Sequence, residues 1–155
     1  MVKVFDFFSG CGGTSLGFKR LGFDIVGALD FDQDSATTYQ ENFPDVPFFL
    51  HDIRDVLVED ISSVISNRKE LLLFCGCAPC QPFSGQRKIL KKDDPRRNLL
   101  SEFQRFIEFW KPEYIFLENV PGLQNVNKSE GVFKRFTDCL DDLKYTYNTS
   151  VVKAS

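Results

Sequence analysis

The chain has 155 residues, of which 43% are hydrophobic and 26% are charged, and its formal net charge at pH 7 is −3. This length predicts one domain with a sizeable core, and the composition excludes a disordered chain. The five cysteines are an odd set, no apolar run approaches the ~20 residues of a membrane span, and the start lacks a signal-peptide pattern. We therefore expect a protein of the reducing cytoplasm, with no disulfide scaffold and no membrane partner.

The charge is unevenly distributed along the chain. Six basic and two acidic residues lie between Arg87 and Arg97, so this stretch carries +4 while the rest of the chain carries −7. A solvated lysine-rich loop and a contact surface for nucleic acid both explain such a stretch.

Short β-rich runs alternate with helical patterns. The helical segments run from near Thr14 to Gly22, from a cap at Asp34 to Pro44, over 99–110, and from a start near Ser129 with an apolar stripe over 132–143. This alternation predicts an α/β fold with a largely parallel sheet, and ligands bind at the carboxyl ends of such strands. The predicted strands are 3–8, 24–29, 46–50, 71–76, 113–118 and 145–152.

A glycine-rich segment, residues 9–17, follows the first predicted strand and leads into a helix. Asp30 ends the second strand, where an acid can accept hydrogen bonds from both ribose hydroxyls of an adenosine cofactor, and Asp52 follows the third, within reach of an adenine amino group. The segment lacks both the spaced GxGxxG pattern and the P-loop ending. It therefore favours S-adenosylmethionine, an adenosine cofactor without a phosphate chain, although both acids also suit helix caps or solvated loops.

The fourth predicted strand runs into a segment with three cysteines within six residues, CGCAPCQPFSG (75–85). A zinc site would need a second pair of ligands, which the sequence lacks. A thioredoxin-like pair of Cys77 and Cys80 would place Cys80 in the first turn of a helix, and Pro82 would interrupt that helix. A buried structural cysteine is a further alternative. The remaining interpretation is a single nucleophilic thiol, Cys80, at the carboxyl edge of the sheet.

Glu118 is the candidate partner of that thiol. It ends the fifth predicted strand, and adjacent parallel strands bring their carboxyl ends to one cleft. His51 is the single histidine, which gives little support to a hydrolase built on a Cys-His or Ser-His pair. An ion-paired acid at a strand end is the alternative for Glu118.

These segments carry a resemblance to a known family. FDFFSGCGGTSLGF, ALDFD, HDIRDV, CAPCQPFSGQ, DDPRRNLL and ENVPGL resemble, in order and spacing, the first six motifs of the C5 cytosine methyltransferases. The resemblance implies a Rossmann-like S-adenosylmethionine-dependent methyltransferase fold, with helices on both faces of the sheet. It implies a nucleophile at Cys80, a pyrimidine-holding carboxyl at Glu118 and no metal. It also implies cofactor contacts from Phe8, Gly10, Gly13, Asp30, Phe31, Asp52, Ile53 and Leu99.

The resemblance also implies the substrate, the product and a prokaryotic, nucleoid-associated location in the cytoplasm. The substrate is double-stranded DNA with a cytosine flipped out of the helix, and S-adenosylhomocysteine is the cofactor product. The basic stretch is then similar to a loop that closes over DNA and binds phosphates. Asp30 stands where Glu is usual, and Cys77 where Gly is usual. The implied DNA contacts are Gln81, Ser84, Arg87, Lys88, Lys91, Lys92, Arg96 and Arg97.

Similar enzymes continue well beyond Ser155, with a Gln-Arg-Arg motif, a target-recognition region and a final segment near the cofactor. We therefore expect residues 1–155 to be a cofactor-binding and catalytic domain truncated before its last strands, either a fragment or one half of a split enzyme that needs a second polypeptide. The isolated chain should bind cofactor weakly and should not methylate DNA at a specific sequence. A non-catalytic binding module and an enzyme of the branch that methylates transfer RNA are the alternatives.

Overall fold

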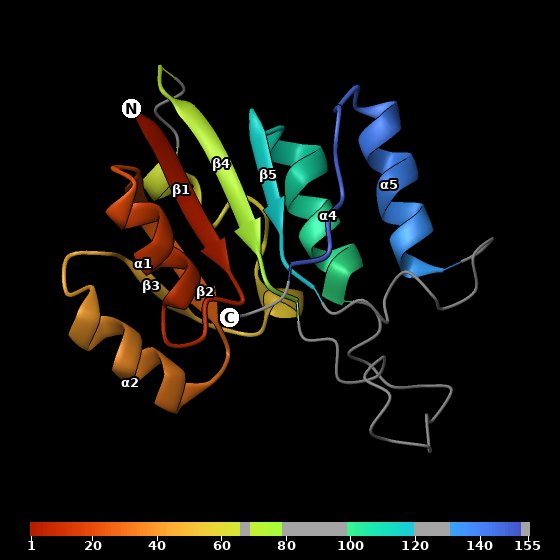
Figure 1. Ribbon diagram of the computed structural model, residues 1–155. Coiled ribbons are helices and arrows are strands. Elements are labelled where there is room, and N and C mark those ends of the chain that lie inside the picture. Colours follow the sequence, from red (N-terminus) through yellow and green to blue (C-terminus); the bar gives the residue numbers. More distant parts are fainter. Residues whose placement is uncertain (66–68, 79–98, 120–130, 153–155) are drawn as a thin grey trace.

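Five strands form one parallel sheet in the order β3-β2-β1-β4-β5 (Figure 1). The computed structural model describes residues 1–65, 69–78, 99–119 and 131–152. Each chain crossover between neighbouring parallel strands requires a connection that returns over one face of the sheet, so helices lie between the strands. The strands are β1 Val2–Phe7, β2 Asp24–Asp30, β3 Phe48–Leu50, β4 Leu71–Gly76 and β5 Tyr114–Leu117.

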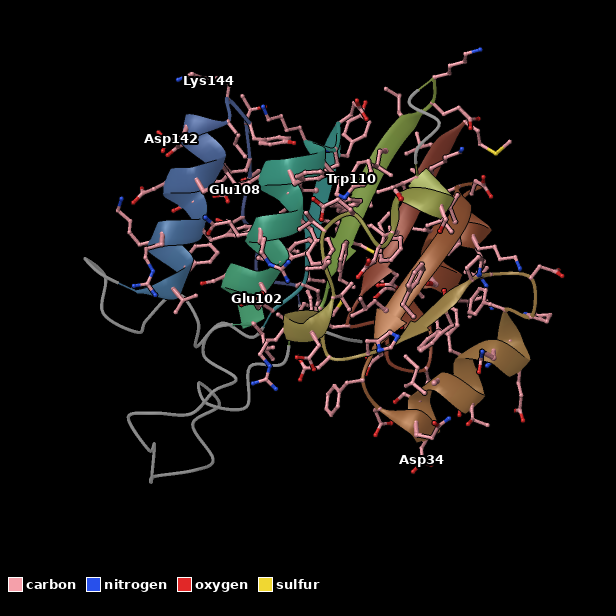
Figure 2. The ribbon with its side chains drawn as sticks, turned by 180° about the vertical axis from the view of Figure 1, so that it is seen from behind. Asp34, Glu102, Glu108, Trp110, Asp142 and Lys144 are labelled. Atoms are coloured by element: carbon pink, nitrogen blue, oxygen red, sulfur yellow. The ribbon has the colours of Figure 1, made fainter. Side chains whose placement is uncertain are left out.

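The helices divide between the two faces of the sheet (Figure 1). Two of them, α1 and α2, cover what we call the α1 face, and α3, α4 and α5 cover the opposite α4 face. Figure 2 views the molecule from behind, with Glu108 and Trp110 on α4 and Asp142 at the end of α5. The helices are α1 Gly13–Arg20, α2 Gln33–Asn42, the 3-10 turn η1 Ile53–Asp55, α3 Ser62–Ile65, α4 Leu99–Trp110 and α5 Val132–Asp142.

The alternation of side chains along β1 explains why the two faces differ. Phe5 and Phe7 point to the α4 face, where the Phe7 ring lies 5.1 Å from Phe103 and 5.0 Å from Phe106 between centroids. Val4 lies in the apolar cluster of the α1 face, and Asp6 contacts α1. The central strand therefore supplies an aromatic core on one side and a mixed apolar and polar layer on the other.

The doubly wound parallel sheet is confirmed, together with the first five strands and the helix over 99–110. The predicted cap at Asp34 is wrong: Asp32 caps α2, because its carboxylate accepts a hydrogen bond from the Ser35 amide at 2.8 Å. The N-cap of α5 is Gly131. The predicted start near Ser129 lies outside the described residues.

The predicted strand over 145–152 is wrong. Among the described residues, β5 pairs only with β4, and residues 145–152 run beside β5 without a strand ladder. The segment is anchored at its start, where the Tyr145 amide binds the Leu140 carbonyl and the Tyr145 hydroxyl donates to the Pro112 carbonyl. A groove of about 460 Å³ is lined by this segment, β5 and α5. Local β-propensity is present, but a strand also needs a paired neighbour.

No helix in the described part of the chain is long and apolar enough to cross a membrane.

Candidate cofactor and active site

The loop after β1 lies at the switch point of the sheet. The strands β1 and β4 are neighbours, but the chain continues from β1 to α1 on one face and from β4 towards α4 on the other. Left-handed backbone at Phe8, Gly10 and Gly12, with φ of 57°, 51° and 91°, turns the loop sharply. A Cβ added at Gly10 or Gly13 would meet nothing within 4 Å, so both glycines border open space. The buried Ser9 hydroxyl has no hydrogen-bond partner among the described residues. These features fit a ligand held against the loop.

Asp30 ends β2 directly opposite this loop. Its side chain is nearly buried, and one carboxylate oxygen accepts from the Gly10 amide at 2.8 Å while the other accepts from the Asp32 amide at 3.0 Å. Each oxygen keeps a second lone pair, so the carboxylate can still accept from ligand hydroxyls. Phe31 follows with 66% of its surface exposed, a large apolar ring that a bound purine would cover. Asp30 and Phe31 therefore fit the ribose and base of an adenosine.

Asp52 and Ile53 form the edge of the site beyond β3. The Asp52 carboxylate caps η1 by accepting from the Arg54 amide at 3.0 Å, and it also accepts from Arg54 Nε at 2.8 Å. Hydrogen bonds from the Arg54 guanidinium hold the pKa of Asp52 below its usual value. An adenine amino group would therefore share this carboxylate with Arg54. Ile53 is buried and packs into the core of the α4 face.

Arg105 holds that edge in place, and sequence reasoning missed it. From α4, its guanidinium donates to the carbonyls of Ile53 and Val56 at 3.0 Å and forms an ion pair with Glu102. Leu99, a predicted cofactor contact, starts the same helix and is buried. Glu102 lies near the beginning of α4 in Figure 2. A separation of about fifty residues between the arginine and its carbonyl partners leaves no local pattern in the sequence from which the contact could be predicted.

The ends of β4 and β5 lie near the loop after β1 (residues 8–13), which we call the cofactor loop because of the role proposed for it, and Cys77 is the point of contact. The Glu118 amide donates to the Gly76 carbonyl at 3.1 Å, which fixes Glu118 beside the end of β4 with an exposed side chain. The Cys77 sulfur lies 3.3 Å from Thr14 Oγ1 at the start of α1. Burial raises the pKa of the Cys77 thiol. The structure thus places Glu118 and the cofactor loop at one edge of the sheet.

Cys80 and the predicted DNA contacts lie outside the described residues, so their roles stay predictions. Among the residues that the structure does describe, no three His, Cys, Asp or Glu side chains gather as a metal site. The predicted residues in this group are Cys80, Gln81, Ser84, Arg87, Lys88, Lys91, Lys92, Arg96 and Arg97.

Three buried polar residues below the loop were also missed: Asp6, Ser15 and Tyr39. Burial raises the pKa of Asp6 to about 6, against the hydrogen bond from Ser15 that lowers it. An acid between the phenylalanines of a buried strand is an unusual residue, and this was the available signal. Ser15 and Tyr39 gave none, because both fit ordinary helix positions.

Comparison with known proteins defines the class. Residues 2–155 match the family model of the C-5 cytosine-specific DNA methylases, and the chain belongs to this family. It is similar to the type II methyltransferase M.AquIA of a Picosynechococcus species, at 33% identity over 92% of this chain and 58% of that protein. It is also similar to M1.HphI of Haemophilus parahaemolyticus, at 33% identity over 99% of this chain but 41% of that protein.

Two solved structures share the fold. One is a prophage-encoded protein of E. coli described as a DNA modification methyltransferase, with a TM-score of 0.76 and 32% identity. The other is a Spodoptera frugiperda DNMT2 variant, with a TM-score of 0.70 and 27% identity. The match covers 92% of this chain but only 38% and 41% of theirs. The chain therefore spans less than two thirds of the length of each of these four relatives.

Proposed function

We propose that the chain is the cofactor-binding and nucleophile-bearing part of a DNA (cytosine-5)-methyltransferase. The observation that carries the proposal is the arrangement at one sheet edge: the glycine loop with open space before it, the Asp30 carboxylate that closes the loop, and Glu118 fixed beside the end of β4. Family membership over residues 2–155 supports the same function. S-adenosylmethionine, when bound, supplies an electrophilic methyl group.

The protein's own residues activate the cytosine. The Cys80 thiolate adds to carbon 6 while the Glu118 carboxyl donates a proton to N3, so no negative charge accumulates on the ring and carbon 5 becomes nucleophilic. After carbon 5 takes the methyl group, loss of its proton expels the thiolate and restores the double bond between carbons 5 and 6. The cytosine must leave the duplex to reach this site, and the basic stretch between Arg87 and Arg97 would hold the DNA by its phosphates.

The complete enzyme needs more protein than these residues. The relatives are much longer than this chain, which covers 58%, 41% and 38% of three of them. This difference supports the presence of a further part that reads the target sequence, either on the same polypeptide or on a second one. Among the described residues β5 pairs only with β4, so its other edge and the groove beside it give a segment of that further part a place to pack. We therefore expect the isolated chain to bind cofactor weakly and to show no sequence-specific methylation.

Covalent trapping tests the proposal. A duplex containing 5-fluorocytosine should form an adduct with this chain when the product of the adjoining reading frame and S-adenosylmethionine are present, because fluorine at carbon 5 cannot leave as a proton. Cys80→Ser should abolish the adduct. Cys139→Ser, which removes a thiol on α5 that donates to Glu108, should retain it. Absence of any adduct with the intact chain would instead favour a non-catalytic module.

A further inference from the structure

A buried chain of hydrogen bonds lies directly under the cofactor loop. Asp6 on β1, Ser15 on α1 and Tyr39 on α2 have no exposed surface, and they come from three different elements. Ser15 Oγ donates to Asp6 Oδ2 at 2.6 Å and lies 2.8 Å from the Tyr39 hydroxyl. Ser15 has one hydroxyl proton, which it gives to Asp6, so Tyr39 must be the donor to Ser15. The direction of both hydrogen bonds is therefore fixed.

The Tyr39 ring also supports the turn of the loop. Gly12 has a φ of 91°, and a Cβ added there would lie 2.9 Å from the Tyr39 ring and 2.7 Å from the Phe43 ring. These two rings pack on each other with centroids 4.7 Å apart. Tyr39 thus contacts the loop through its ring and the first turn of α1 through its hydroxyl.

The Gly10 side of the loop is also connected to α2. Asp30 binds the Gly10 amide with one oxygen and the Asp32 amide with the other, and Asp32 caps α2. Tyr39 lies further along α2. Both ends of the loop are therefore tied to one helix, through Asp30 and Asp32 at its start and through Tyr39 in its second turn.

We propose that Tyr39, acting through Ser15 and Asp6, is a positioning residue that fixes the cofactor loop from Gly10 to Gly13 in its binding conformation. A core tyrosine with a purely structural role would need only to fill space and satisfy its hydroxyl. The Tyr39 hydroxyl does more than this, because it is one end of a chain of two hydrogen bonds that joins α2, α1 and the central strand beneath the loop. The inference rests on the proposed function only in naming S-adenosylhomocysteine as the ligand of the loop.

Amide hydrogen exchange tests the role of this hydrogen-bond chain without any ligand. The Gly12 amide binds the Ser9 carbonyl and the Leu16 amide binds the Gly12 carbonyl, both at 2.9 Å, so these two amides report loop opening. Tyr39→Phe, which keeps the ring against Gly12, should speed their exchange about fivefold to tenfold while amides in β4 stay unchanged. Tyr145→Phe is the matched control, since it also removes one hydrogen-bonded hydroxyl but acts beside β5. It should leave the Gly12 and Leu16 amides at the wild-type rate.

Substitutions at Asp6 and a ligand complete the test. Asp6→Asn keeps an oxygen that accepts from Ser15 and should exchange near the wild-type rate, whereas Asp6→Ala should behave like Tyr39→Phe. Calorimetry should show that Tyr39→Phe weakens S-adenosylhomocysteine binding by a similar factor. Equal acceleration in the loop and in β4 would overturn the inference, because it would mean only a general loss of stability. If the wild type binds no S-adenosylhomocysteine, the proposed function is in question while the exchange data still decide the role of Tyr39.

Discussion

The two faces of the sheet are stabilised in different ways. On the α4 face, Phe7, Phe74, Phe103 and Phe106 form one aromatic core whose side chains need no hydrogen-bond partners. On the α1 face, the apolar clusters are smaller, and the space near the cofactor loop is filled by hydrogen-bonded polar groups. The α4 face therefore supplies most of the folding free energy. The α1 face holds the loop in a defined shape, and its buried polar groups lower the stability of the fold.

Truncation in the aromatic core should have the largest effect. Phe103 has no exposed surface and lies between the Phe7 and Phe136 rings, so Phe103→Ala should lower the free energy of unfolding by about 3–5 kcal/mol. Phe109→Ala on the same helix removes a ring that is 51% exposed and should cost under about 1 kcal/mol. Urea unfolding measures both. Similar losses in the two variants would contradict the assignment of the main core to this face.

Asp6 should make the α1 face sensitive to pH. Its pKa is about 6 in the folded protein against 3.8 for an ordinary aspartate, so ionisation costs folding free energy. The contribution of Asp6 to stability should therefore fall by about 3 kcal/mol in total as pH rises through the interval between these two pKa values, and then level off. Among the described residues, the other titratable groups near Asp6 are Asp30, Tyr39, Cys75 and Cys77.

Asp6→Asn isolates this contribution, because the amide cannot ionise. The difference in unfolding free energy between the variant and the wild type, measured by urea titration at several pH values, should grow over the same interval. A difference that stays constant from pH 4 to pH 7 would show that Asp6 does not ionise in the folded protein with a raised pKa.

Two glycines five positions apart, Gly12 and Gly17, should respond to substitution in opposite directions. Gly12→Ala places a methyl group against the Phe43 and Tyr39 rings at a positive φ, and should destabilise the chain by about 1–3 kcal/mol. Gly17 lies inside α1 with nothing within 4 Å of an added Cβ, so Gly17→Ala should stabilise by about 0.5–1 kcal/mol. Thermal unfolding of both variants checks the signs, and a shared sign would contradict the tight seating of the loop.

The sequence predicted the strands that pair within the sheet and failed for residues 145–152, which form no strand ladder among the described residues. The runs that became β1 to β5 each pair with a neighbour, whereas residues 145–152 carry the same kind of residues but lie beyond an edge strand. The cap of α2 was missed by two residues, because Asp32 and Asp34 are chemically identical candidates and only backbone geometry separates them.

The candidate site was predictable where its residues follow strands in order. Asp30 and Glu118 could be placed from strand ends alone, since parallel strands end at one edge. The supporting residues could not. Arg105 reaches carbonyls about fifty residues away, and Tyr39 meets Ser15 at a separation of 24, so neither contact leaves a local pattern. Contacts between residues this far apart in the sequence depend on how the helices pack against the sheet, and no local sequence pattern predicts that packing.

The sheet order also bears on how the chain folds during synthesis. The first strand of this sequence, β1, occupies the centre of the sheet, with β2 on one side and β4 on the other. Residues 1–50 can form a three-stranded unit before the rest is made, but the second edge of β1 stays unpaired until residues 71–76 have been made. Until then an apolar strand edge is open to other chains. We therefore expect the interval between the synthesis of β1 and of β4 to be the period in which a nascent chain most readily aggregates.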